Sequence, residues 1–154
     1  MAKSPAPLED VPEYPKEWSS LKREAVIAQL DKLGVNANTS FFVARWLDVN
    51  GAAAESYFYY FKAIGLEHAH VGMYGRFFER AYADHVYNVA QIVAKEAAKL
   101  FPKEARVWLW VARAAAAHGD KAIYESSITK AQDMKVAADE VALVRQHTAH
   151  FFKK

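Results

Sequence analysis

The chain alternates between amphipathic stretches and short polar breaks, a pattern typical of consecutive helices. Apolar residues recur every three or four positions, a spacing that places them on one side of an α-helix. The stretch before Pro102 is the clearest example, because Val89, Val93 and Ala97 share one side and polar residues share the other. The pattern predicts eight helices and no strand, over about residues 21–33, 40–49, 52–64, 71–82, 84–100, 103–117, 120–134 and from 137 onward.

The breaks between these helices carry residues that end or start a helix. Glycine follows four of the predicted helices, at Gly34, Gly51, Gly65 and Gly119, and this is the position that a helix C-terminus favours. Asp84 opens the fifth helix, and we expect its side chain to cap that helix. Both kinds of residue support the predicted helix boundaries.

The helix predicted over 52–64 carries five consecutive aromatic residues, from Tyr57 to Phe61. A haem or quinone pocket is one interpretation of this cluster, and a side that faces the core is the other, which helical spacing favours. Tyr59 points away from that side, which makes it a candidate for contact with a partner. The expected core residues of this helix are Ala54, Tyr57, Phe58, Phe61 and Ile64.

The first eighteen residues differ from the rest of the chain. They hold four of the five prolines, which predicts an extended arm over 1–18 followed by a helical-repeat domain over 19–154. Tyr14 and Trp18 are candidates either to contact a partner or to fold back on the first helix. We expect no targeting segment in the arm, because it lacks both an apolar stretch and an arginine-rich amphipathic pattern.

Short runs of sequence recur along the chain. Residues 42–45 recur as 110–113, and residues 61–66 repeat the pattern of 30–35. The offsets correspond to repeat units of about 34 residues, a length typical of stacked helical hairpins. We therefore predict an all-α fold of stacked antiparallel helical hairpins, a short α-solenoid. Its helix over 103–117 is apolar on two sides and is expected to be sandwiched between neighbours.

Composition narrows the classes of function. The chain has 29 alanines against six glycines and five prolines, which favours helices over a barrel or a sandwich. It has no cysteine, so disulfides, thiolate catalysis and cysteine-based metal sites are excluded. A formal net charge of +2 gives no strong field for nucleic acid or an anionic membrane. No apolar run approaches the roughly 18–20 residues that a membrane span needs.

Two stretches of the chain resemble known helical repeats. Residues 54–66, with Phe58, Phe61 and Gly65, resemble the second helix and exit turn of a pentatricopeptide repeat, and residues 108–134 resemble the related tetratricopeptide pattern. Among small pentatricopeptide-like proteins, the chain resembles the accessory F1 subunits of euglenozoan mitochondrial ATP synthase. This resemblance implies a non-catalytic structural subunit of a larger protein assembly in the mitochondrion. Without it, we expect a cytoplasmic protein.

Two alternatives to a structural subunit remain open: an RNA-binding repeat protein and an adaptor that binds peptides. Repeat proteins that read RNA use two or three side chains for each base, and pentatricopeptide proteins place polar readers near the start of each first helix. The corresponding positions in this chain are largely apolar, which argues against base reading. They are Phe42 or Val43, Met73 or Tyr74, and Trp110 or Val111.

Histidines are the remaining candidates for metal chemistry. His147 and His150 stand three residues apart in the last predicted helix, and Glu67 with His70 forms one Glu-x-x-His. A di-iron site needs two such motifs on separate helices, and the sequence has no second copy. The sequence also has no phosphate-binding loop or nucleophile motif. We therefore expect a protein without catalysis, cofactor or metal.

Three arginines recur at corresponding places of the predicted repeats. They form either a row of positive charge (a basic ladder) that contacts a partner, or internal pairs with carboxylates of this chain. The usual behaviour of arginine at such seams favours the internal pairs. We expect the partners to be protein subunits of a larger complex rather than RNA. The candidates for partner contact are Tyr14, Trp18, Tyr59, Arg45, Arg76 and Arg113.

Overall fold

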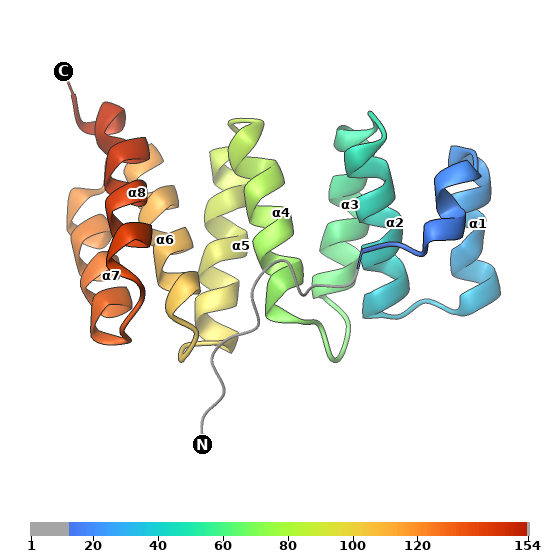
Figure 1. The fold of residues 1–154 in the computed structure, drawn as a ribbon, viewed down its shortest axis with the longest axis horizontal. Coiled ribbons are helices and arrows are strands. Elements are labelled where there is room, and N and C mark those ends of the chain that lie inside the picture. The colour runs from blue at the N-terminus through green and yellow to red at the C-terminus, as the bar shows by residue number, and fades with distance from the viewer. Residues whose placement is uncertain (1–12, 154) are drawn as a thin grey trace. The chain divides into compact units, whose positions relative to one another are not determined.

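The computed structural model describes residues 13–153, and every regular element in that range is helical. Eight α-helices are present, with a short 3-10 helix near each end of the described range, so the predicted all-α class is confirmed (Figure 1). Within this range, none of the helices has the length and apolarity needed to span a membrane. The elements are η2 Lys16–Ser20, α1 Arg23–Leu33, α2 Ala37–Val49, α3 Ala53–Ile64, α4 Val71–Ala83, α5 Tyr87–Leu100, α6 Ala105–Ala117, α7 Lys121–Asp133, α8 Ala138–Thr148 and η3 Ala149–Phe152.

The described residues divide into two compact units, and the boundary lies inside α4. The first unit ends at Arg80 and the second starts at Ala81, whereas the sequence predicted one helical domain from residue 19. Helical structure begins at Lys16, in η2, and so the predicted arm over 1–18 is not extended throughout. Its residues 1–12 lie outside the described range.

The first unit is built around the α2–α3 hairpin, with α1 packed against α2. Large aromatic side chains form its core, and Phe41, Tyr60 and Phe77 are fully buried. The Tyr60 ring stacks on the Phe77 ring with centroids 5.1 Å apart, and the Phe41 centroid lies 6.0 Å from that of Tyr60. These three rings join α2, α3 and the first part of α4.

The second unit packs α6 against α5, α7 and α8. Buried residues cover more than one side of α6, including Leu109, Trp110 and Ala116, so the predicted sandwiched helix is confirmed. Alanine dominates this core, and small side chains let helix axes approach closely. The buried alanines of α5, α6 and α7 are Ala90, Ala94, Ala97, Ala98, Ala112, Ala114, Ala115, Ala116 and Ala131.

Side-chain caps determine where two of the helices begin. The Asn36 side chain accepts a hydrogen bond from the Thr39 amide at 2.9 Å, and the Thr39 hydroxyl accepts one from the Asn36 amide at 3.1 Å. This capping box starts α2 at Ala37, three residues before the predicted start at Ser40. In the second unit, the Asp120 carboxylate accepts from the amide three residues on and caps α7.

Glycines end the helices as predicted, while the predicted start of α5 is wrong. Gly34 and Gly119 have φ values of 86° and 74°, in the left-handed region that glycine adopts without a steric penalty. The helix α5 begins at Tyr87, and its N-cap position belongs to Val86 rather than to Asp84. Asp84 therefore lies too far upstream to cap this helix.

Candidate interaction surfaces

A cluster of charged side chains lies inside the first unit. Asp48 is at its centre, where one carboxylate oxygen accepts from the Tyr60 hydroxyl at 2.5 Å and from Arg45 at 3.2 Å. The other oxygen accepts from Arg80 at 3.0 Å. The Asp48 side chain is only 7% exposed, so these bonds take the place of water. We call Arg45, Asp48, Tyr60 and Arg80 the ionic centre.

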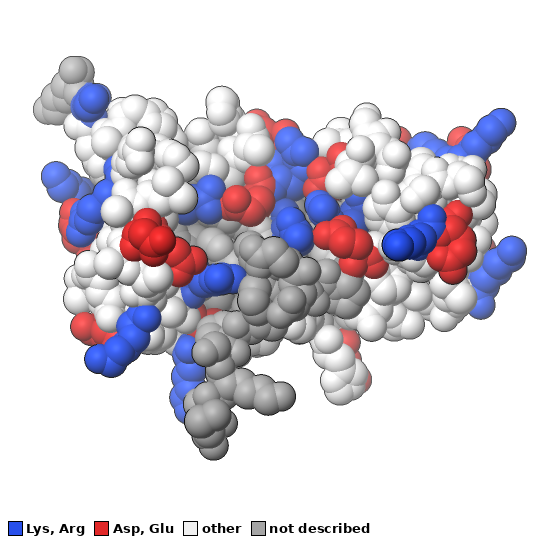
Figure 2. Space-filling view, in the orientation of Figure 1, with Lys and Arg blue, Asp and Glu red and all other residues white. Residues whose placement is uncertain are grey.

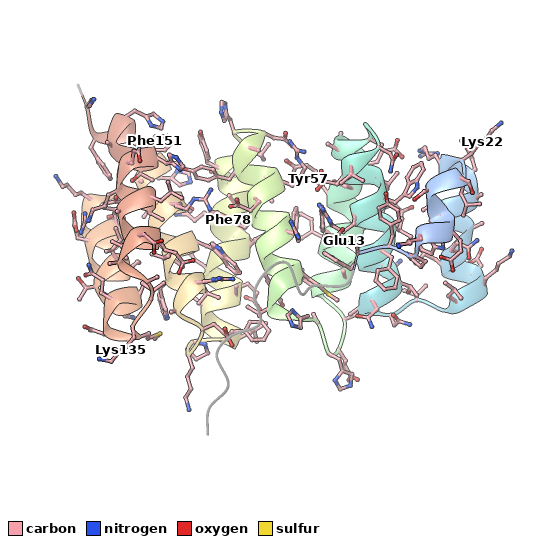
Figure 3. All side chains as sticks on the ribbon, viewed as in Figure 1. Glu13, Lys22, Tyr57, Phe78, Lys135 and Phe151 are labelled. Atoms are coloured by element: carbon pink, nitrogen blue, oxygen red, sulfur yellow. The ribbon has the colours of Figure 1, made fainter. Side chains whose placement is uncertain are left out.

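Glu13, labelled in Figure 3, extends the ionic centre toward the arm. Its carboxylate accepts from Arg45 Nε at 2.8 Å and lies 3.3 Å from a terminal nitrogen of Arg76. Two of the three recurring arginines thus pair with the same carboxylate of this chain, whose side chain is 43% exposed. In the second unit, Arg113 lies over the ring of Tyr82, 4.4 Å from its centre.

Burial and hydrogen bonding determine the protonation of the ionic centre. Burial raises the pKa of the Tyr60 phenol above its ordinary value, and its hydrogen bond to Asp48 raises that pKa as well. Burial alone would lower the pKa of the Arg45 guanidinium, but its hydrogen bonds to Glu13 and Tyr60 raise it. At neutral pH Tyr60 is therefore a hydrogen-bond donor and Arg45 a cation, and both roles stabilise the packing of α2 on α3.

Trp18 is a core residue in this structure rather than an exposed anchor. Its side chain is 4% exposed and meets Phe42 edge-on, with ring centroids 6.1 Å apart. Its carbonyl accepts a hydrogen bond from the Trp46 indole at 2.9 Å. Tyr14 is half-buried against the same cluster. Of the two alternatives that the sequence left open, folding back therefore describes Trp18, and the contact extends to α2 as well as α1.

The outer side of α3 carries two exposed phenylalanines. Phe58 is 63% exposed and Phe61 is 42% exposed, although helical spacing had predicted both in the core. That prediction was wrong because aromatic residues occupy every side of this helix, so spacing alone could not identify the buried one. The buried side consists of Ser56, Tyr60 and Ala63.

These phenylalanines belong to a continuous exposed line along α3 and its exit turn. Lys62 lies beside it, with its Nζ 5.6 Å from the centre of the Phe58 ring. Tyr59, predicted to be the exposed aromatic of this helix, is instead half-buried against the cluster around Trp18. We call the exposed line the α3 stripe, and its members are Ala54, Phe58, Phe61 and Gly65.

The two candidate metal pairs from the sequence lie near the end of α8, for His147 and His150, and in the turn before α4, for Glu67 and His70. His70 Nδ1 accepts a hydrogen bond from the Gly72 amide at 2.9 Å, at the start of α4, so this nitrogen is not free to bind a metal. The helix α8 ends at Thr148, so His147 and His150 do not share one α-helix. Among the described residues, no group of three or more His, Asp or Glu side chains is placed to hold a metal ion.

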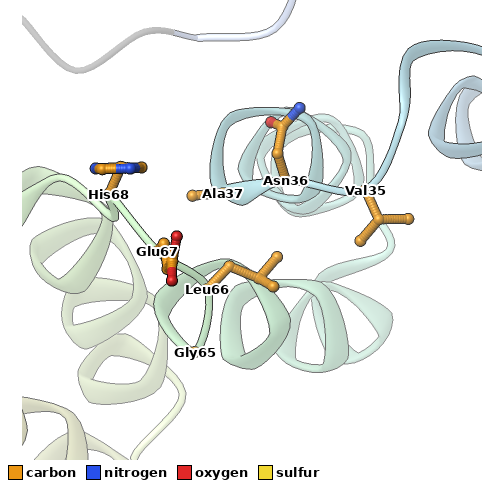
Figure 4. A pocket seen from close by; sticks show the side chains of 7 residues that line it. All are labelled: Val35, Asn36, Ala37, Gly65, Leu66, Glu67 and His68. Carbon is orange, nitrogen blue, oxygen red and sulfur yellow. The ribbon is translucent and has the colours of Figure 1, made fainter.

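A cavity of about 480 Å³ lies between the turn before α2 and the turn after α3 (Figure 4). Val35 and Leu66 form its apolar wall, and Asn36, Glu67 and His68 supply its polar groups. The Asn36 side chain already caps α2. The remaining carboxylate and imidazole lie in a turn and, by themselves, define no particular ligand chemistry.

The positions corresponding to RNA readers are mostly core positions here. Val43 and Met73 are fully buried, and Trp110 is almost so. The Tyr74 hydroxyl donates to the Ile64 carbonyl at 3.1 Å. On the face of the first unit seen in Figure 2, acidic and basic side chains are interspersed. Packing within each unit therefore explains why these positions are largely apolar.

Comparisons with models of protein families, with characterised proteins and with solved structures gave no significant match. Three members of the ionic centre, Asp48, Tyr60 and Arg80, were not predicted from the sequence. A partial signal exists, because Asp48 follows Arg45 by three residues, which places both on the same side of α2. The contacts of Asp48 with α3 and α4 depend on the tertiary fold.

Proposed function

We propose that this protein is a non-catalytic subunit of a larger protein assembly and that the α3 stripe is its main docking surface. The exposure of Phe58 and Phe61 carries this proposal. Two phenylalanines on adjacent turns keep apolar surface in water, and contiguous apolar patches on a protein surface are typical of interaction sites. Aromatic side chains also supply much of the binding energy at such interfaces.

The ionic centre supports this proposal by making α3 a rigid element. Tyr60, on the buried side of α3, is bonded to Asp48 of α2, and Arg80 of α4 is bonded to the same carboxylate. Buried bonds of this kind hold the three helices in one arrangement before any partner arrives. A preformed surface loses less conformational entropy when it binds.

The F1 sector of a mitochondrial ATP synthase is the specific assembly that we propose. The support is the resemblance of residues 54–66 and 108–134 to pentatricopeptide and tetratricopeptide repeats. This resemblance favours architecture built for binding rather than for catalysis. A mitochondrial location is part of the same proposal.

Native purification of the tagged full chain, followed by mass spectrometry, tests the proposed function. We expect other protein subunits at fixed stoichiometry and, for the specific proposal, the subunits of F1. Recovery of the protein alone, or with RNA that survives high salt, would contradict a role as an assembly subunit.

A matched pair of variants tests the docking surface in the same experiment. Phe58→Ser removes the most exposed phenylalanine of the stripe, and we expect it to reduce the recovery of partner subunits, among which a co-expressed untagged copy of this chain is counted. Ile92→Ser is the control, because Ile92 is 58% exposed on α5 in the other unit. Equal recovery with both variants would show that the α3 stripe is not the docking surface.

A further inference from the structure

We propose that the α3 stripe binds the α3 stripe of a second copy of this chain, with the two helices antiparallel about a twofold axis. The inference rests on the proposed function, because it names the occupant of the same surface. Three features of the stripe support it: its symmetric spacing, the sizes of its side chains and the charges beside it.

The spacing of the stripe is the same when it is read in either direction. Its four members are separated by four, three and four residues, and both the outer and the inner pair are centred between Tyr59 and Tyr60. An antiparallel pairing about that centre puts Phe58 of one copy opposite Phe61 of the other. It also puts Ala54 opposite Gly65. A twofold interface needs this kind of self-complementary surface.

The side chains have sizes that suit such a pairing. Intervals of three and four residues are those of the seam between two packed helices, where side chains of one helix fill spaces on the other. The small members, Ala54 and Gly65, lie at the ends of the stripe, and the two phenylalanines lie in the middle. The large rings would therefore meet each other, and the small residues would allow the helix ends to approach.

Charges beside the stripe are complementary under the same pairing. Glu55 and Lys62 are two turns apart, about 10 Å, and so they lie on one flank of the stripe. In an antiparallel pair a twofold axis brings the same flank of each helix together, so Glu55 of one copy faces Lys62 of the other, twice. Tyr57 and Ile64 line the opposite flank, which is apolar.

Glu55 is available for this contact as an anion. Its carboxylate accepts hydrogen bonds from Arg23 of α1, and this interaction lowers the pKa of Glu55. The Glu55 side chain remains 43% exposed, so its outer side can receive a second cation. In the dimer, Lys62 of the partner copy would join Arg23 around the same carboxylate. Pairing with a parallel helix would not bring Glu55 and Lys62 together.

Sedimentation velocity of the purified full chain tests this proposal. A single pair of helices buries less surface than a standard stable interface, so we expect a monomer–dimer equilibrium with a dissociation constant of about 1–100 μM. Phe58→Ser should weaken it about 30-fold or more, the effect of removing a central aromatic anchor. Ile92→Ser should leave it unchanged, and circular dichroism shows whether both variants remain helical.

Charge exchange tests the antiparallel orientation. Lys62→Glu places two carboxylates opposite each other at two symmetric positions, and we expect about fivefold weaker dimers. Glu55→Lys should act in the same direction by opposing two lysines. The double variant Glu55→Lys with Lys62→Glu restores opposite charges across the interface, so it should recover most of the lost affinity.

Four results would overturn this inference, and the first three are measured on the purified chain. They are a monomer at every concentration up to about 1 mM, well beyond the expected dissociation constant, a dimer that Phe58→Ser does not weaken, and a double charge variant no stronger than the single ones. Recovery of a different protein that requires Phe58, from a chain that is monomeric when pure, would also overturn it while leaving the proposed function intact. If the unmodified chain forms no dimer and is recovered without any partner protein, both proposals are contradicted together.

Discussion

The two units of this protein build helical cores from opposite kinds of side chain. In the first unit, large rings fill the space between helices, and Tyr60 and Phe77 are fully buried and stacked. In the second unit, alanines such as Ala94 and Ala112 line the contacts around α6. An aromatic core is sensitive to the loss of a side chain, because a large cavity remains, whereas an alanine core is sensitive to the addition of one.

The units also differ in how they use charge. The first unit encloses a carboxylate, Asp48, whose side chain is 7% exposed. In the second unit, the ion pair of Arg145 with Glu125 lies near the surface, and each of the two side chains is 46% exposed. A buried ion pair is expensive to break, while an exposed one contributes little.

Tryptophans allow each unit to be followed separately, because Trp18 and Trp46 lie in the first unit and the other two tryptophans lie in the second.

Truncation of the aromatic core should have the largest effect. Phe77→Ala removes a ring that contacts Tyr57, Tyr60 and Phe61, and we expect a loss of about 4 kcal/mol from the free energy of unfolding. Denaturant titration of protein labelled with 5-fluorotryptophan, followed by fluorine NMR, measures this loss in the first unit. Ile92→Ala is the control at an exposed position. A loss below about 1 kcal/mol would contradict an aromatic core.

Removal of the buried carboxylate should come next. Asp48→Ala leaves Arg45 and Arg80 without their shared partner, and we expect a loss of about 3 kcal/mol in the same titration. Glu125→Ala removes the exposed partner of Arg145 and should cost at most about 0.5 kcal/mol. Equal effects of the two substitutions would remove the distinction between the ionic centre and a surface pair.

Enlargement of the alanine core should have a smaller effect, confined to the second unit. Ala112 is fully buried, so Ala112→Leu adds three carbon atoms to a packed interface, and we expect a loss of about 2 kcal/mol. Ala142→Leu, at an exposed position of α8, is the control for helix propensity. A neutral or stabilising Ala112→Leu would mean that this core contains unfilled space.

Alkaline pH should have the smallest effect, through Tyr60. Its pKa is raised in the folded protein, while in the unfolded chain it ionises near pH 10, so its contribution to stability is present below that pH and is lost above it. The loss should reach about 1 kcal/mol at pH 11. Denaturant titrations of the native chain and of Tyr60→Phe at pH 8 and pH 11 measure it by difference. Identical pH dependence in both proteins would contradict a buried, protonated Tyr60.

The comparison of the two units also shows what the sequence could predict. The number of helices and their C-terminal ends follow from local signals, such as Gly34 and Gly119, and these predictions agree with the structure, whereas the predicted starts of α2 and α5 do not. The burial of α6 on more than one side could be predicted, because its apolar residues occupy more than one face of the helix. The buried side of α3 could not, because Tyr57 through Phe61 are all aromatic and only the contacts with α2 and α4 distinguish Tyr60 from Phe58.

The same distinction applies to the candidate interaction surfaces, because some of their features could be predicted from the sequence and others could not. The recurrence of Arg45 and Arg76 was visible in the sequence, and so was the preference for internal pairing. The choice of Glu13 as their common partner was not, because it brings together residues more than thirty positions apart. The exposure of Phe58 likewise depends on tertiary packing.

The central claim is that the α3 stripe is covered by protein when this chain is in its native surroundings. A photoreactive amino acid in place of Phe58, activated in intact cells, tests it most directly, with the same substitution at Ile92 as the control. We predict strong, defined protein cross-links from position 58 and few from position 92. Absence of cross-links from position 58 in folded protein, or equal cross-linking from both positions, would contradict the account.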